Sequence, residues 1–237
     1  MTSHTTNPLL EATRLLDYDH PKIKQLVAAR GWEKLNDDEK IRAIYTFVKD
    51  EIHFGYNKAD TLPASKVLKD GLGQCNTKTT LLMTLLRAVG IPCRFHGFTV
   101  DKTVQEGILS GIWYNLAPQE ILHSWTEVQI NDQWVPLEGV ILDDNYLEQL
   151  RDKFNDKDTV CGFGAASNVF HETTEKFNGE PTYIQSKAIV KDYGVFSNPD
   201  EFYKEHHQKL PFWKEWLFKH LVRNIMNSNV SKIRKGI

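Results

Sequence analysis

The sequence lacks the features that mark membrane-spanning, secreted and nucleic-acid-binding proteins. No stretch approaches the ~18 consecutive apolar residues of a membrane-spanning helix. The first residues have neither the basic start nor the apolar run of a signal peptide. Because 31 acidic residues nearly balance 29 basic ones, the formal net charge is only −2 and no strong field favours nucleic acid. We therefore expect a globular protein with no membrane span and no nucleic-acid partner.

Cysteine is scarce as well. The three cysteines, Cys75, Cys93 and Cys161, are an odd number, and their spacing is typical neither of a disulfide framework nor of a metal site. His171-Glu172 lacks the second histidine of the His-Glu-x-x-His zinc motif. Free thiols in a reducing cytoplasm are the simplest explanation. The sequence therefore predicts a cytoplasmic protein without a metal or a cofactor.

Helical patterns dominate the first half of the chain. With 237 residues, 41% of them hydrophobic, the chain can bury a substantial core. Apolar residues at helical spacing, preceded by a capping Asn36 or Asp37, predict a helix that ends near His53. A second, mostly buried helix is expected to begin at Cys75, directly after a glycine-rich turn, and to end at 90–92.

The segments that follow this helix favour strands. Three of them have the pattern of strands: 93–100, 123–130 and 134–141. A short polar turn at 131–133 separates the last two, which predicts a hairpin. One buried helix followed by antiparallel strands indicates an α+β fold, with N-terminal helices packed on an antiparallel sheet. Residues 57–74, apart from a short helix, and 162–166 are expected to be loops.

Three regions are expected along the chain: an N-terminal extension (1–36), a core (37–150), and an α-rich C-terminal extension packed on the core (151–237). In the C-terminal extension, the sequence favours a strand at 182–190, a helix that starts at Asn198-Pro199, and a last amphipathic helix over 212–226. Basic residues and an apolar stripe on that last helix would suit a membrane surface or a partner helix. Docking on the chain's own core is the interpretation that we favour.

Cys75 is the best candidate for chemistry. A thiol becomes a strong nucleophile as the thiolate, which is favoured at a helix N-terminus or beside an imidazolium. The glycine-rich turn places Cys75 at such a helix start, where unpaired N–H groups favour an anion. The backbone N–H of Cys75 could also stabilise an oxyanion formed after attack, and the side chain of Gln74 is a further candidate donor.

His123 and Glu138 are the expected partners of this cysteine. His123 opens the strand-like segment 123–130 and is the candidate base. If Asn131-Asp132 is a two-residue turn, His123 falls opposite residue 140, and Glu138 is its diagonal neighbour on the same face. Glu138 would then orient the imidazole. Asp143 is the alternative orienting carboxylate.

Three motifs together resemble the transglutaminase-like superfamily. GQC at 73–75, followed by a leucine-rich helix and LRAVGIP at 86–92, looks like the nucleophile segment of that family. HSWTEV at 123–128 is similar to its histidine strand, and WVPLE at 134–138 lies where the family carries its third catalytic residue. The resemblance covers roughly residues 40–145 and implies a papain-like α+β core. It departs from the family at Glu138, since the third residue is usually aspartate.

The resemblance also implies a site and an activity. The family tends to place an aromatic residue upstream of the cysteine to help hold the oxyanion, and Tyr56 matches that position. Trp125 is a further candidate for the cleft, but packing in the core or the hairpin is the role that we favour for it. We predict acyl transfer on a peptide, a protein or a small amide through Cys75, His123 and Glu138. Hydrolysis is favoured over cross-linking, and the alternative is an inactive papain-like scaffold that binds a peptide or protein partner. The oligomeric state stays open.

Overall fold

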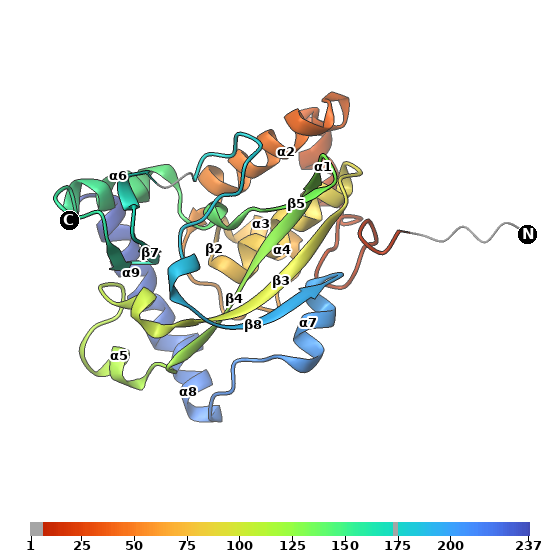
Figure 1. Ribbon diagram of the computed structural model, residues 1–237. Helices are drawn as coiled ribbons and strands as arrows, with labels where there is room; N and C mark the ends of the chain where they lie inside the picture. Colours follow the sequence, from red (N-terminus) through yellow and green to blue (C-terminus); the bar gives the residue numbers. More distant parts are fainter. Residues whose placement is uncertain (1–6, 173–174) are drawn as a thin grey trace, which may run out of the picture.

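The computed structural model describes residues 7–172 and 175–237, and a four-stranded antiparallel sheet lies at its centre (Figure 1). Its strand order is β5-β4-β3-β8. The strands are β3 (Cys93–Asp101), β4 (Glu120–Ile130), β5 (Gln133–Pro136) and β8 (Ile189–Phe196). Long β3 and β4 pair along nine residues of each and form the middle of the sheet. The predicted α+β class, with helices packed on an antiparallel sheet, is confirmed.

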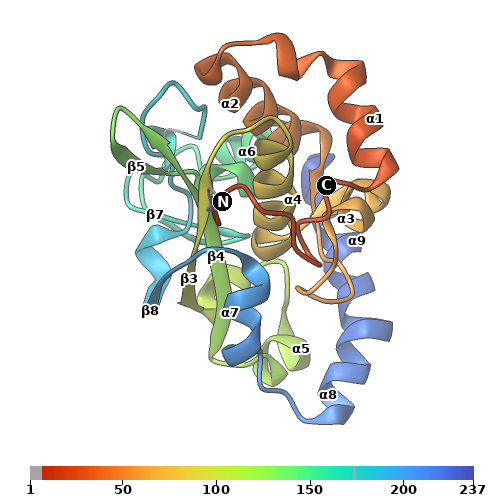
Figure 2. The same cartoon turned by 90° about the vertical axis from the view of Figure 1, so that its right-hand side faces the viewer.

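Helix α4 (Cys75–Ala88) packs against one face of this sheet (Figure 2). Side chains all around this helix are buried, as the wide apolar stripe predicts. On the side of the helix that faces the sheet, the hydroxyl of Thr79 donates to the carbonyl of Ser124 on β4. Three helices pack on α4: α1 (Pro21–Arg30), α2 (Asp37–Thr46) and α3 (Ala64–Asp70). The nucleophile helix is thus held in the centre of the molecule.

The segment before α4 is more ordered than the sequence indicates. Helix α2 begins with a capping box at Asn36 and continues as a π-helical turn over Phe47–Glu51, in agreement with the predicted helix. Strands β1 (His53–Phe54) and β2 (Leu72–Gly73) then pair in parallel. Residues 72–73 were expected to be loop, because a two-residue pairing between distant segments leaves no periodic pattern.

The hairpin after α4 corrects one prediction. Asn131 and Asp132 have φ values of 49° and 62°, as a two-residue type I′ turn requires, and Ile130 pairs with Gln133. However, β5 ends at Pro136, so the strand predicted over 134–141 is present but its predicted end is wrong. The backbone N–H of Glu138 donates to the carbonyl of Thr182, and a 3₁₀ turn over Glu138–Ile141 follows. Glu138 is therefore not a diagonal neighbour of His123 in the sheet.

The C-terminal part of the chain contributes to the sheet as well as to the helices. Short strands β6 (Val160–Gly162) and β7 (Ala165–Ser167) form a hairpin where a loop was expected. Strand β8 begins at Ile189, later than predicted, and pairs with β3. Helix α7 (Pro199–Glu205) starts with the predicted asparagine cap. The domain boundary at residue 150 remains a prediction, although β8 lies in the same sheet as β3 and β4.

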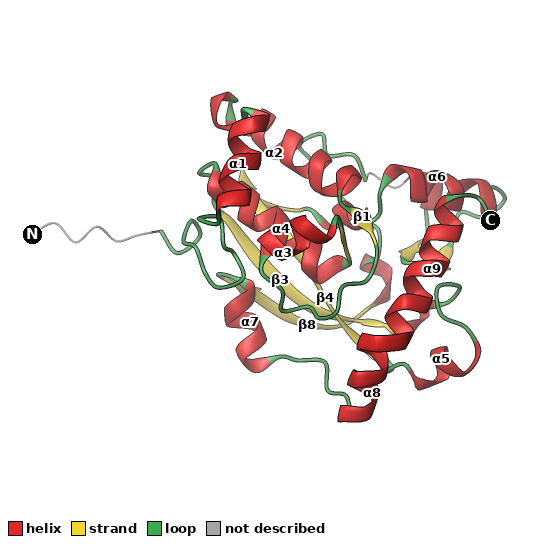
Figure 3. Cartoon of the chain, turned by 180° about the vertical axis from the view of Figure 1, so that it is seen from behind, coloured by secondary structure: helices red, strands yellow, loops and turns green. Residues whose placement is uncertain are grey.

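Helices at the C-terminal end complete the molecule. Helix α8 (Phe212–Leu217) continues through a π-helical turn (Phe218–Val222) into α9 (Arg223–Arg234), beyond the end predicted at 226. Figure 3 shows α9 beside α6 (Asp144–Lys153), with the short α5 (Gly111–Leu116) near α8. In the part of the chain that the structure describes, no helix is long and apolar enough to cross a membrane.

Candidate active site

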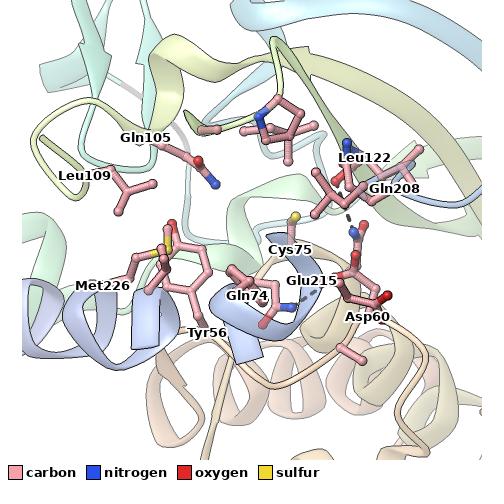
Figure 4. Close-up of a pocket in the computed structure, with 18 of the residues that line it drawn as sticks. Tyr56, Asp60, Gln74, Cys75, Gln105, Leu109, Leu122, Gln208, Glu215 and Met226 are labelled. Atoms are coloured by element: carbon pink, nitrogen blue, oxygen red, sulfur yellow. Dashed lines mark hydrogen bonds between the residues drawn. The ribbon is translucent and has the colours of Figure 1, made fainter. Parts of the chain in front are cut away.

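Cys75 is the first residue of α4, and its half-buried side chain faces a cavity (Figure 4). The turn before it needs glycine. A Cβ atom on Gly73 would lie 2.8 Å from both Cγ of Lys78 and Oγ1 of Thr77. The first intrahelical bond of α4 runs from the N–H of Lys78 to the carbonyl of Gln74. The N–H groups before it, including that of Cys75, have no intrahelical acceptor.

The amide of Gln74 shapes this turn. Its Oε1 accepts a hydrogen bond from the backbone N–H of Asn57 at 2.8 Å, and its Nε2 donates to Oδ1 of Asp60 at 2.9 Å. Figure 4 shows Gln74 turned toward Asp60, below the sulfur of Cys75. Gln74 lines the cavity, but its role in holding an oxyanion stays a prediction.

His123 and Glu138 lie together in the interior, and neither side chain has any exposed area. Nε2 of His123 and Oε1 of Glu138 are 2.9 Å apart. The second oxygen of Glu138, Oε2, accepts hydrogen bonds from the backbone N–H groups of Ile184 and Gln185 at 2.9 and 3.1 Å. The carboxylate is thus held at both oxygens, and it reaches His123 from a 3₁₀ turn rather than from a strand.

Asp143, the alternative orienting residue, has a different role. Its Oδ1 accepts from the backbone N–H of Tyr146 and caps α6, and its Oδ2 accepts from the N–H of Phe54 at 2.8 Å. Both oxygens also receive the guanidinium of Arg234 on α9. These contacts join three segments of the chain, and none of them involves His123.

His123 lies within the electrostatic influence of Cys75. Burial by itself lowers the pKa of His123, but the charge of Cys75 and the contact with Glu138 raise that pKa to about 10. Because Nε2 faces Glu138, Nδ1 is the nitrogen left for the thiol. Nδ1 is buried and, within residues 7–172 and 175–237, has no partner at good hydrogen-bond geometry. The imidazole and the thiol thus do not form a well-aligned hydrogen bond, as is common without substrate.

The cavity above Cys75 has a volume of about 310 Å³, within the range of small-ligand sites. In Figure 4 the sulfur of Cys75 points into the cavity, with Leu109 and Met226 on one side and Leu122 and Gln208 on the other. Many apolar residues belong to the remaining wall, among them Val100, Val104, Trp113, Leu116, Ala117, Ile121, Leu217, Phe218 and Val222. The cavity therefore suits an apolar group next to the thiol.

Tyr56 lines this cavity. Asn227 of α9 holds its backbone, since Oδ1 of Asn227 accepts from the N–H of Tyr56 and Nδ2 donates to its carbonyl. Burial raises the pKa of Tyr56 well above its ordinary value, and the charges of Tyr146 and Cys75 raise it further. The hydroxyl of Tyr56 therefore keeps its proton and can donate.

Trp125 does not line the cavity. Its ring packs on Phe98 with the centroids 4.0 Å apart, and its Nε1 donates to Oε1 of Glu127. The packing role that we favoured from the sequence is the one seen in the structure.

Several cavity residues carry no signal in the sequence. Asp60 lies in the loop before α3, and Tyr203 and Gln208 come from α7 and the segment after it. Both ends of the Gln208 amide bond the backbone of β4, at Leu122 and at Glu120. Among the described residues, no group of three or more His, Cys, Asp and Glu side chains could hold a metal ion.

Lys78, on the first turn of α4, is a buried cation beneath the site. Its Nζ donates to the carbonyls of Lys49 and Ile141 at 2.9 and 3.0 Å. Burial lowers the pKa of Lys78 to about 7, although the charge of Asp143 opposes the shift. Unfolded, this lysine holds its proton up to pH ~10.4. The unfolded state thus binds more protons above pH 7, so this group makes folding more favourable as the pH rises.

A Lys78→Met variant is expected to remove that dependence. Between pH 7 and pH 9 the buried lysine should raise the free energy of unfolding of the wild type by about 2 kcal/mol, and the variant should lack this gain. Urea unfolding at the two pH values measures this difference. Lys69→Met, at the end of α3, is the control. An equal difference for Lys78→Met at both pH values would show that the buried amine does not titrate in this range.

Residues 25–139 of the chain match the family described as the transglutaminase-like superfamily. The chain thus carries a transglutaminase-like core, and its helix-on-sheet fold is transglutaminase-like. Among solved structures it is similar to one described as "a Putative Cysteine Protease from Cytophaga hutchinsonii", with 15% sequence identity and a TM-score of 0.46. The match covers 82% of this chain and 47% of that protein, so this chain spans about half of its length. The search of curated proteins found no match.

Proposed function

We propose that this protein is a thiol enzyme that hydrolyses an amide or peptide bond through Cys75, His123 and Glu138. The observation that carries the proposal is the position of His123, whose Nε2 is fixed by buried Glu138 while Nδ1 is left for Cys75. Cys75 lies at a helix start and opens onto a cavity. The transglutaminase-like core supports a cysteine-based enzyme.

The proposed reaction has two halves. Sγ of Cys75, as thiolate, attacks the carbonyl carbon of the substrate, and the oxygen becomes an oxyanion. The N–H of Cys75 and the hydroxyl of Tyr56 are the proposed donors to that oxyanion. The imidazolium of His123 gives its proton to the leaving nitrogen, and the C–N bond breaks to leave a thioester on Cys75. Water, deprotonated by His123, then attacks the thioester and releases a carboxylic acid and the free thiol.

An amine could replace water in the second half and give a new amide. Hydrolysis is proposed because water needs no binding site of its own at the acyl-enzyme. Mass spectrometry of the products with and without an added primary amine separates the two outcomes. A peptide library, with the Cys75→Ala variant as the blank, identifies the amides that are cleaved.

Selective alkylation is expected to identify Cys75 as the nucleophile. At pH 6.5–7, iodoacetamide should modify Cys75 at least about tenfold faster than either other thiol, because an imidazolium favours the thiolate. Cys93 should be slowest, since it is fully buried and burial raises its pKa to about 11. Peptide mapping after timed quenching gives the three rates.

His123→Ala is expected to remove most of this advantage, and exposed Cys161 is the internal reference. Equal rates for Cys75 and Cys161 in the wild type would contradict the enzymatic proposal. They would favour the other candidate, an inactive scaffold that binds a peptide or protein partner.

A further inference from the structure

One end of the cavity carries an acid without a cationic partner. Asp60 lines the cavity beside Cys75, and its Oδ1 accepts a hydrogen bond from Gln74. Among the described residues, no lysine, arginine or histidine forms an ion pair with Asp60. Burial raises the pKa of Asp60, although hydrogen bonds from Gln74 and Asn76 oppose the shift. A positive charge beside Asp60 would stabilise its ionised form.

Tyr203 lies at the same end of the cavity. Only 7% of this residue is exposed, and its ring packs on Phe95 and Phe202. Its hydroxyl is buried and has no hydrogen-bond partner within the described part of the chain. Burial raises the pKa of Tyr203 well above its ordinary value, and the charges of Asp60 and Cys75 raise it further. The hydroxyl therefore stays protonated and lies within the electrostatic reach of both groups.

Two lysines of the cavity wall have other contacts. Nζ of Lys214 donates to the carbonyl of Leu116 at 2.9 Å, and Nζ of Lys219 pairs with Glu215 at 2.6 Å. Lys58 lines the cavity, but its side chain is exposed. Near Cys75 the cavity thus presents a carboxylate without a counter-ion, Asp60, and a phenolic hydroxyl without a hydrogen-bond partner among the described residues, Tyr203. An ammonium group suits both, because its three N–H donors match a carboxylate and the lone pairs of a hydroxyl.

We propose that Asp60 and Tyr203 bind a primary ammonium group of the acyl donor, so that the preferred substrate carries a free amine close to the scissile carbonyl. The assignment rests on the proposed acyl transfer at Cys75, because the thiol sets where the carbonyl lies. The apolar wall formed by Leu109, Leu122 and Met226 lies around the same sulfur. An amide of an amino acid with an apolar side chain and a free α-amine would occupy both parts of the cavity.

Direct binding to the Cys75→Ala protein tests the ammonium site without turnover. The probes are leucinamide and N-acetylleucinamide, which share the side chain and the amide but differ in charge. At pH 6 the α-amine, with a pKa of about 7.7–8.0, is charged. Calorimetry should show at least about tenfold tighter binding of leucinamide, as expected for charge-assisted hydrogen bonds.

Three further substitutions in that protein test the assignment to residues. Asp60→Asn keeps an acceptor for Gln74 and removes the charge, so it should abolish the preference for leucinamide. Tyr203→Phe keeps the ring and should reduce the preference. Asp152→Asn, an exposed acid on α6 outside the cavity, should keep it. Equal binding of the two probes, or no detectable binding of leucinamide at millimolar concentration, would overturn the proposal, as would a preference unaffected by Asp60→Asn.

Turnover assays show whether the bound ammonium belongs to the acyl donor or to the acyl acceptor. Leucine p-nitroanilide should be cleaved at least about tenfold more efficiently than its N-acetyl form, and Asp60→Asn should remove that ratio. If Asp60→Asn changes only the fraction of acyl-enzyme captured by added methylamine, the ammonium belongs to the acceptor and the donor assignment is wrong. If neither anilide nor any library peptide is cleaved while leucinamide binds as expected, the proposed function fails and the ammonium site stands.

Discussion

A Cys75→Ala variant is expected to lose amide turnover by a factor on the order of 10⁴ or more, because the covalent step has no other nucleophile. The loss should come from chemistry and not from unfolding. The turn before α4 is held by Gln74 and Asn57, and the sulfur takes no part in those hydrogen bonds. The same melting temperature as the wild type is therefore expected.

The measurement is kcat/KM on the best peptide or anilide found with the wild type. Cys161→Ala is the matched control, because Cys161 is an exposed thiol outside the cavity. It should keep wild-type activity. If purified Cys75→Ala protein retained a substantial share of the turnover, another group would be the nucleophile and the proposed mechanism would be wrong.

A Glu138→Gln variant is expected to lower kcat/KM by roughly 10²–10⁴ while changing KM much less. The carboxylate accepts at both oxygens: Oε1 faces Nε2 of His123, and Oε2 receives two backbone N–H groups. A glutamine has one acceptor oxygen, so its NH₂ group must face either His123 or those N–H groups. If the NH₂ group faces the two backbone N–H groups, donors oppose donors. If it faces Nε2 of His123, the imidazole loses the acceptor that orients it.

Two companion substitutions separate orientation from stability. Glu138→Ala leaves the N–H groups of Ile184 and Gln185 buried without an acceptor, at a cost of about 3 kcal/mol in unfolding free energy. Glu138→Asp restores the residue usual in the family, yet it should also lose activity. The shorter side chain cannot reach His123 from the 3₁₀ turn while it holds both N–H groups.

Glu148→Gln, at an exposed position on α6, is the control for charge removal and should leave kcat/KM unchanged. Urea unfolding of each variant accompanies the kinetics. Wild-type turnover by a well-folded Glu138→Gln protein would show that Glu138 has only a structural role. His123 would then be oriented in some other way.

Much of the fold could be predicted from local pattern. The capping asparagines at 36 and 198, and the apolar stripe of the helix that starts at Cys75, are properties of neighbouring residues. The turn at Asn131-Asp132 was predicted for the same reason. The length of β5 could not be predicted from local pattern. The backbone of Thr182 forms hydrogen bonds with residues 136–139, and the chain leaves the sheet there.

The candidate site shows the same division. His123 and Glu138 were predicted as partners, and they are in contact, but the expected geometry across two strands is absent. The long side chain of Glu138 reaches from outside the sheet instead. Gln74 was considered as an oxyanion donor, whereas its amide is engaged with Asn57 and Asp60. Side-chain partners of this kind depend on atoms that a pattern of residue types does not specify.

The sequence by itself determined the α+β class, the helix that starts at Cys75, and the candidate residues Cys75, His123 and Glu138. These features follow from local spacing and from motifs that a short stretch of chain contains. Only the tertiary structure decided which groups surround the thiol. Tyr203 and Met226 reach the cavity from helices more than 120 residues after Cys75. Contacts over such separations are set by how helices and strands pack, and packing leaves no periodic mark in the sequence.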